Sequence, residues 1–178
     1  MGQGRLDADD PCAPVDAAQR PAAIWPARMR TLGSWLVNKT AVHSHRITSE
    51  GFASVGGHRT QYALLASLDE FGSSSQADLG RRCGYDRSDV AVVVGELVRA
   101  GYAERAQDPA DRRRNIIAIT PAGRSRLAEL DVVIADMQEA FLAPLDAAER
   151  AELVRLLGRV LDHHTALHGH PPFPGPGA

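Results

Sequence analysis

Several features that mark other protein classes are scarce or absent in this chain of 178 residues. The two cysteines, Cys12 and Cys83, provide neither a disulfide framework nor a paired-cysteine metal site. No apolar run reaches the roughly 18 residues of a membrane span, so no membrane partner is expected. The first ten residues are polar and acidic, unlike a secretion signal, and we expect a cytoplasmic protein.

Common catalytic motifs are missing as well. The sequence holds no GxSxG, no HExxH, no P-loop and no GxGxxG after a strand. We therefore expect no enzyme and no cofactor. The histidine pairs His43 with His45 and His164 with His168 lack grouped carboxylates or thiolates, so no metal site is expected either.

Excess positive charge is also absent, since 20 Lys and Arg residues stand against 22 Asp and Glu residues and the formal net charge is −2. A chain with this balance does not bind nucleic acid by bulk attraction. Any such binding must come from arginines placed locally.

The apolar pattern that is present predicts a mainly α-helical chain with one small β-hairpin, an α+β fold. Helical spacing predicts a first helix that ends at Gly51 and a short second helix that ends at Phe71. Few large apolar residues in 1–22 and recurrent prolines in 169–178 predict two disordered tails.

A short helix, a tight turn and a longer helix are predicted next. Ser75 with Asp78 forms a variant capping box for the short helix, Gly84 ends it, and Asp86 caps the longer one. The longer helix carries a buried stripe, which consists of Val90, Val93, Val94 and Leu97.

A β-hairpin follows, with strands near 102–106 and 116–119 and a charged loop between them. This order of helix, turn, longer helix and hairpin is that of a winged helix-turn-helix. In that fold the second helix enters a DNA major groove and the hairpin tip reaches the backbone or the minor groove.

Two long helices are predicted after the hairpin. Thr120 caps the first, with Pro121 at its first position, and its apolar residues form a narrow seam of Leu127, Leu130, Ile134, Met137 and Phe141. Asp146 with Glu149 caps the last helix, whose apolar face holds Leu153, Leu156, Leu157, Val160 and Leu161.

The run from Gln76 to Gly123, about a quarter of the chain, resembles the MarR family of bacterial transcription regulators. The matching residues are Leu79, Gly80, Arg87, Ser88, Leu97, Gly101, Asp108, Pro109, Asp111, Arg113, Thr120 and Gly123. The resemblance implies a winged helix-turn-helix at 59–120. It also implies a dimerisation domain built from an N-terminal helix at 23–58 and C-terminal helices at 121–168.

Two groups of residues are predicted to contact double-stranded DNA at a pseudo-palindromic operator. The outer face of the longer helix presents Arg87, Ser88, Asp89, Ala91 and Val92. Many relatives have threonine or arginine where Ala91 and Val92 stand, which weakens hydrogen-bonded base reading and leaves apolar contact with thymine methyl groups. Arg87 could read guanine or hold phosphate. Asp89 could accept a hydrogen bond from cytosine or cap its own helix, and capping is favoured.

The hairpin tip is the second group. Three consecutive arginines beside two aspartates favour phosphate or a narrow minor groove. By resemblance, Arg113 is the minor-groove arginine and Asp111 holds its guanidinium, while Arg112 and Arg114 are left for phosphates or structural pairs.

A homodimer is expected, because two heads related by a dyad bind half-sites one helical turn apart. Its interface is predicted to comprise Leu127, Leu130, Ile134, Met137, Phe141, Leu153, Leu156 and Val160. The alternative for these residues is packing within the chain.

The resemblance further implies a small-molecule effector, since family members sense phenolic or lipophilic anions. Candidate contacts are Trp35, Asn38, His45, Arg46 and His58. The expected function is a repressor released by such an effector. Two alternatives are a regulator that senses oxidants through Cys83 and a winged-helix protein-interaction module that does not bind DNA.

Overall fold

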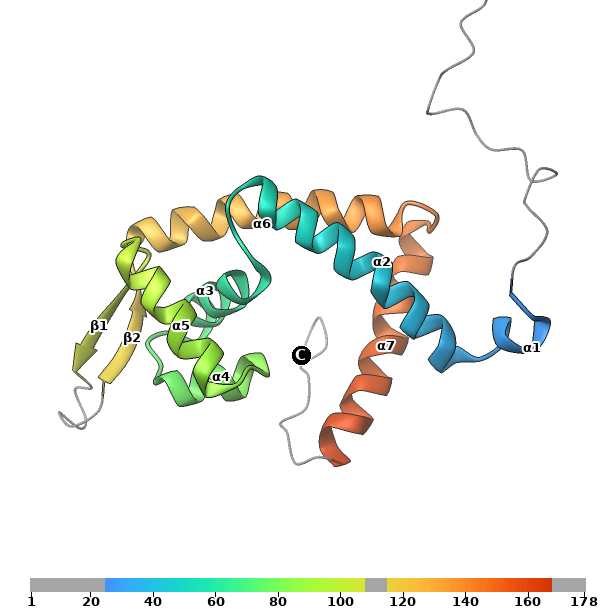
Figure 1. Ribbon diagram of the computed structural model, residues 1–178, viewed down its shortest axis with the longest axis horizontal. Helices are drawn as coiled ribbons and strands as arrows, with labels where there is room; N and C mark the ends of the chain where they lie inside the picture. Colours follow the sequence, from blue (N-terminus) through green and yellow to red (C-terminus); the bar gives the residue numbers. More distant parts are fainter. Residues whose placement is uncertain (1–24, 108–114, 168–178) are drawn as a thin grey trace, which may run out of the picture. The chain divides into compact units, whose positions relative to one another are not determined.

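The computed structural model describes residues 25–107 and 115–167 (Figure 1). In chain order the elements are α1 (Ala27–Arg30), α2 (Gly33–Ser54), α3 (Arg59–Phe71), α4 (Gln76–Cys83), α5 (Arg87–Arg99), β1 (Ala103–Gln107), β2 (Asn115–Ile119), α6 (Pro121–Leu142) and α7 (Ala147–Leu167). The predicted mainly helical class with one hairpin is confirmed. Across these described ranges, no helix is both long and apolar enough to cross a membrane.

The chain divides into two compact units, one up to Ala41 and one from Val42. In the first unit, Trp35 packs edge-on against Trp25, with ring centroids 5.0 Å apart, and the Lys39 ammonium lies over both rings. The first unit thus holds α1 and the part of α2 up to Ala41. The rest of α2 and the elements from α3 to α7 belong to the second unit. The predicted tails, 1–22 and 169–178, lie outside the described residues.

The predicted end of the first helix at Gly51 was wrong, because α2 continues to Ser54. Gly51 lies within the helix where α6 packs on it, and a Cβ at this position would overlap the side chain of Met137. The chain turns instead at Gly56, whose φ is 61°. The missing side chain of Gly51 therefore serves helix packing and not termination.

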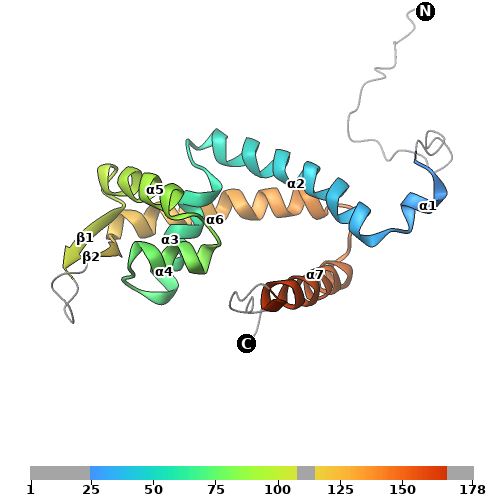
Figure 2. The ribbon, with the colours of Figure 1, turned by 60° about the horizontal axis from the view of Figure 1, so that its bottom comes forward.

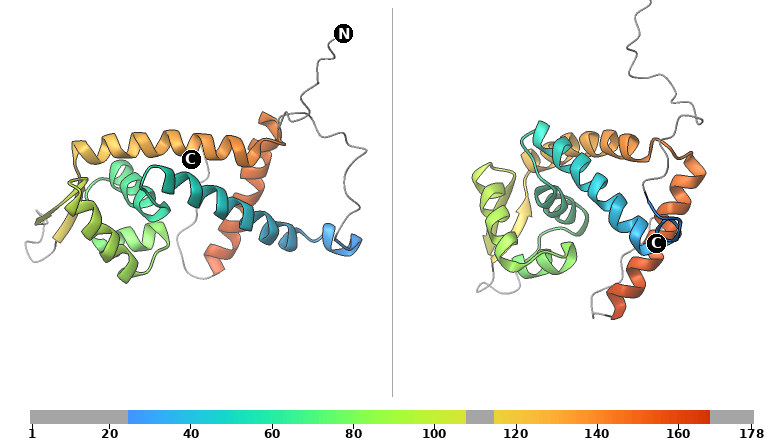
Figure 3. Two further views of the ribbon diagram at one scale, coloured as in Figure 1. Left: turned by 45° about the horizontal axis from the view of Figure 1, so that its top comes forward. Right: turned by 45° about the vertical axis from the view of Figure 1, so that its right-hand side comes forward.

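Helix α3 is the centre of the second unit and contacts α4, α5, α6 and β2 (Figures 1 and 3). Its apolar face is the one predicted from helical spacing, with Leu64, Leu65 and Leu68 fully buried. The same core takes side chains from five other elements: Phe52, Leu79, Val90, Val94, Leu97, Ile117 and Leu130.

The predicted pair of helices is present as α4 and α5. Ser75 Oγ accepts a hydrogen bond from the Asp78 amide at 3.2 Å and donates to Asp78 Oδ2 at 2.7 Å. Gly84 ends α4 in the left-handed conformation, with φ at 69°. Asp86 occupies the predicted cap position of α5, but its side chain makes no capping hydrogen bond within the described part of the chain.

The hairpin strands pair antiparallel, with Ala103 opposite Ile119 and Gln107 opposite Asn115. Ser74 adds a short bridge that the sequence did not predict. Its amide donates to the Ile117 carbonyl at 3.0 Å, and the Ile117 amide donates back at 2.9 Å. This bridge ties the base of the hairpin to the start of α4.

Thr120 and Gly123 fix the start of α6 against the end of α5. Thr120 Oγ1 accepts from the Gly123 amide at 3.0 Å and donates to the Gly101 carbonyl at 2.6 Å. A Cβ on Gly123 would overlap the Tyr102 carbonyl, so only glycine allows this close approach. The sequence identified both residues, and the structure supplies their packing role.

The seam of α6 faces the core of its own chain. Leu127, Leu130 and Met137 are buried there, and Ile134 packs against the same cluster. Leu127, Leu130 and Met137 therefore follow the alternative named from the sequence, packing within the chain. The reason is that α3 packs beneath α6 (Figure 3), and Met137 packs against Gly51 of α2. Ile134 and Phe141 are half-buried, and their interface role stays a prediction.

Helix α7 differs, since none of its residues is buried. It begins with the predicted capping box, in which the Asp146 amide donates to Glu149 Oε2 at 3.0 Å and the Glu149 amide donates to Asp146 Oδ1 at 2.9 Å. It then runs away from α6 (Figures 1 and 2). Its large apolar side chains stay exposed, namely Val154, Leu156, Leu157, Val160, Leu161 and Leu167.

Candidate functional site

Helix α5 has two opposite faces. Its inner stripe is buried as predicted, and it consists of Val90, Val93, Val94 and Leu97. The residues predicted to contact DNA are all exposed: Arg87, Ser88, Asp89, Ala91 and Val92. Val92 is 62% exposed, so its side chain is free to contact a partner on this face.

Two arginines on α4 lie next to this helix, and the sequence did not single them out for DNA. Arg82 donates from Nη1 to Ser74 Oγ at 2.9 Å, and its guanidinium lies 4.8 Å from the centre of the Phe71 ring. Arg81 forms an ion pair with Asp78. The Ser75 hydrogen bond, followed by the charges of both arginines, holds the pKa of Asp78 below its usual value.

The hairpin is described at its base only. Its two strands are paired, and Glu104 and Arg105 of β1 are exposed. Asp111, Arg112, Arg113 and Arg114 lie outside the described residues, so their contacts with DNA stay predictions.

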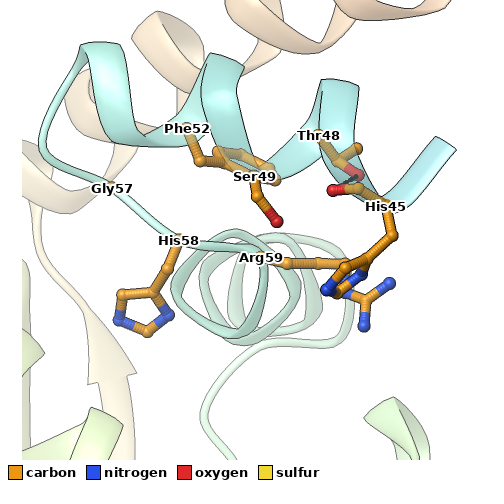
Figure 4. A pocket seen from close by; sticks show the side chains of 7 residues that line it. All are labelled: His45, Thr48, Ser49, Phe52, Gly57, His58 and Arg59. Atoms are coloured by element: carbon orange, nitrogen blue, oxygen red, sulfur yellow. Dashed lines mark hydrogen bonds between the residues drawn. The ribbon is translucent and has the colours of Figure 1, made fainter. Parts of the chain in front are cut away.

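A hollow of about 140 Å³ opens between α2 and the start of α3 (Figure 4). It is lined by His45, Thr48, Ser49, Phe52, Gly57, His58 and Arg59. The hollow thus contains two of the five residues predicted to contact an effector, His45 and His58. In Figure 4, His58 projects on one side of the hollow, apart from His45 and Arg59.

The other three candidates are elsewhere. Arg46 is not among the lining residues and faces Glu50 at 3.9 Å. Trp35 and Asn38 belong to the first unit. Sequence reasoning had no signal for the buried Phe52 as a lining residue, because its spacing marks it as core.

The lining has a clear chemical character. Three of the seven residues carry basic side chains, none is acidic, and Phe52 supplies an aromatic surface. The volume is close to that of a cavity of roughly 150 Å³ that holds one benzene ring. A single-ring anion matches this size, and Arg59 is the one lining side chain with a permanent positive charge.

Cys83 has the properties of a packed thiol. It is half-buried, and its sulfur lies 3.5 Å from the Ala63 carbonyl oxygen, to which it donates. Burial raises the pKa of the Cys83 thiol, which opposes the thiolate that an oxidant sensor needs. The structure therefore gives no support to the alternative of redox sensing.

One comparison matches the stretch of the chain from α3 to β1. A family model described as "MarR family" matches residues 56–114. The chain is 28% identical to the HTH-type transcriptional repressor NicR of Pseudomonas putida, over 57% of this chain and 65% of NicR. It is 33% identical to a candidate regulatory protein for the hcr operon of Thauera aromatica, over 56% of this chain and 60% of that protein.

Among solved structures, the PcaV transcriptional regulator from Streptomyces coelicolor, in complex with its natural ligand, is similar over almost its whole length. The TM-score is 0.65 and the identity 32%, covering 78% of this chain and 98% of PcaV. The chain belongs to the MarR family. Membership confirms the winged helix-turn-helix interpretation of α3 to β2.

The proteins matched by this MarR-family chain are transcription regulators and not enzymes, in line with the sequence prediction. The chain spans less than two thirds of the length of the two curated relatives, 65% and 60%.

Proposed function

We propose that this MarR-family protein is a homodimeric, sequence-specific DNA-binding regulator. It represses transcription from a pseudo-palindromic operator and is released by a small aromatic anion. The observation that carries the proposal is the two-sided character of α5, here named the recognition helix. Its inner stripe holds it to the core while its outer face, from Arg87 to Val92, stays open.

Local charge supports the DNA-binding part of this proposal. Arg87 stands at the first position of the recognition helix, and Arg81 and Arg82 lie on the preceding helix. The net charge of −2 leaves bulk attraction out, so these side chains and the hairpin arginines supply the contacts to phosphate. Exposed Val92 and Ala91 fit against thymine methyl groups.

Selection of bound duplexes from a random pool by the purified full chain tests this part. We expect an inverted repeat with half-site centres roughly 34 to 36 Å apart. Arg87→Ala should cost about 1–3 kcal/mol of binding to the selected duplex. Arg99→Ala, at the opposite end of the same helix, is the matched control and should cost less.

Salt distinguishes DNA binding from the alternative of a protein-interaction module. For each phosphate contacted, the logarithm of the binding constant should fall by about 0.9 per logarithmic unit of salt. A pool that yields no enriched site would instead support the interaction module.

A second copy of the chain is the proposed partner of α7. The exposed apolar face of this helix contains Leu156 and Val160 of the predicted interface, with Leu153 half-buried beside them. On the second unit's part of α2, Val42 is 66% exposed and is a further apolar side chain open to a partner. Leu127, Leu130 and Met137 contribute from within by holding α6 to the core.

The effector site is proposed at the hollow lined by His45, His58 and Arg59. NicR is described as a repressor and PcaV as bound to its natural ligand, which supports a repressor with a ligand-controlled state. Benzoate is the probe, and neutral benzamide is its control. We expect benzoate to weaken binding to the selected duplex and Arg59→Ala to reduce that effect, whereas benzamide should have little effect.

A further inference from the structure

His58 uses both nitrogens of its ring. Nδ1 accepts a hydrogen bond from the Gln61 amide at 3.3 Å and so caps the start of α3, while Nε2 lies 3.1 Å from Glu96 Oε2. Because an accepting Nδ1 carries no proton in a neutral imidazole, the proton is on Nε2 and is donated to Glu96. The hydrogen-bond network thus assigns a single tautomer.

The same side chain belongs to the hollow that is proposed to bind the effector (Figure 4). Glu96, its partner, lies on the recognition helix, on the same continuous helix as Arg87 and Val92. One hydrogen bond therefore joins the wall of the hollow to the element that is proposed to read DNA. Glu96 and the outer face belong to one unbroken helix, so a shift of α5 at Glu96 would carry the outer face with it.

We propose that the His58–Glu96 hydrogen bond couples the hollow to the recognition helix: a bound aromatic carboxylate accepts the Nε2–H hydrogen bond in place of Glu96, and α5 then leaves its DNA-binding position. This inference rests on the proposed function. His58 acts as a positioning residue, through Glu96 and not through a contact with DNA.

Competition for one donor is the physical basis of this coupling. With Nδ1 committed to the cap of α3, the neutral ring has a single N–H, which serves either Glu96 or the ligand. The ligand then binds more tightly to the state in which Glu96 is released. Such a difference in affinity between two states is what coupling between sites requires.

The size of the effect follows from exposure. The His58 and Glu96 side chains are 46% and 47% exposed, so water screens the pair. We therefore expect the loss of this hydrogen bond to change the benzoate response by about two- to fivefold.

The test measures the dissociation constant of the selected duplex with and without benzoate, and the ratio of the two is the response. Glu96→Ala removes the acceptor and should bring this ratio close to one, the value for a chain that does not respond to benzoate. His58→Asn should do the same, because asparagine still caps α3 but is too short to reach Glu96. Glu96→Gln keeps an acceptor oxygen and should retain part of the response.

Benzoate binding without DNA gives a readout that a merely structural role would not move. Glu96→Ala removes the competitor and should tighten benzoate binding by about two- to fivefold. Adding His58→Asn to Glu96→Ala should reduce the response no further, since both changes break one interaction.

Asp69→Ala is the matched control. It breaks another exposed ion pair of α3, between Asp69 Oδ1 and Arg124 Nε at 3.0 Å, which leads to α6 and not to α5. This variant should keep the full response. A full response in Glu96→Ala would overturn the coupling and leave the proposed function standing. An unmodified chain that binds no duplex, or whose duplex binding ignores benzoate, would overturn the proposed function and the coupling together.

Discussion

The helix-turn-helix region and the last helix use the same kind of sequence pattern with opposite results. In α5, apolar residues at helical spacing are buried against α3 and α4. In α7, a comparable apolar face remains exposed along the helix. Spacing identifies an amphipathic helix, but it does not say whether the surface that covers the helix belongs to the same chain.

This difference has an energetic meaning. Buried apolar surface already contributes to the stability of a single chain in the helix-turn-helix region. Under the proposed dimer, the face of α7 contributes when a second copy covers it, and the stability of this region should then depend on protein concentration. Four predictions, from the largest expected effect to the smallest, test whether the two regions differ in this way.

Leu65→Ala in α3 should lower the free energy of unfolding by about 2–5 kcal/mol, because Leu65 is fully buried and its loss leaves a cavity. Leu157→Ala in α7 is the matched change at a side chain that is 43% exposed. In dilute protein it should cost roughly 0.5 kcal/mol or less. Urea denaturation measures both, and equal losses would remove the distinction between the two regions.

Val160→Glu should weaken self-association at least about thirtyfold, roughly 2 kcal/mol, because a charge would enter the proposed apolar interface. Val132→Glu on α6 is the matched control, because Val132 is 63% exposed and Val160 is 58% exposed. Sedimentation equilibrium reports the dimer constant for each variant. Unchanged association in Val160→Glu would place the interface elsewhere.

Ser75→Ala and Asp146→Ala each remove a helix cap and should each cost about 1 kcal/mol. The Ser75 cap belongs to α4 and the Asp146 cap to α7, so the first loss should affect the whole fold and the second should stay within α7. Ser75→Ala should lower global stability in urea. Asp146→Ala should raise amide hydrogen exchange in α7 while protection in α3 stays the same, and faster exchange in both helices would contradict the comparison.

Asp78→Asn gives the smallest effect, and it depends on pH. The Ser75 hydrogen bond lowers the pKa of Asp78 from its ordinary 3.8. Because this pKa is lower in the folded chain than in the unfolded chain, the ionised Asp78 stabilises the fold at pH values above the unfolded-state pKa. That stabilisation is lost as the pH falls through the folded-state pKa. The difference in unfolding free energy between the two chains should be constant near neutral pH and shrink in acid. A difference that grew in acid would contradict the assignment.

Local features of this fold were predictable from the sequence because they depend on neighbouring residues. Caps such as Ser75 and Thr120 and the left-handed Gly84 follow from backbone groups within a few positions. The buried stripe of α5 and its exposed outer face follow from helical spacing. The candidate DNA face is therefore a consequence of periodicity alone.

The effector site was less predictable. Of its candidates only His45 and His58 line the hollow. The hollow forms where the chain turns back from α2 into α3, and helical spacing alone does not show which side chains face that turn. The Ser74 bridge to Ile117 and the contact of His58 with Glu96 join residues 43 and 38 positions apart, respectively. No spacing rule encodes such pairs.

The sequence by itself determined the order of the long helices, the caps at Ser75, Thr120 and Asp146, the hairpin and the family signature, since each depends on local backbone chemistry or on a contiguous motif. Only the tertiary structure decided that Gly51 lies within a helix, that the α6 seam is core, and that α7 is uncovered. Those outcomes depend on which surfaces meet in space. An apolar side chain carries the same signal whether its neighbour comes from its own chain or from another.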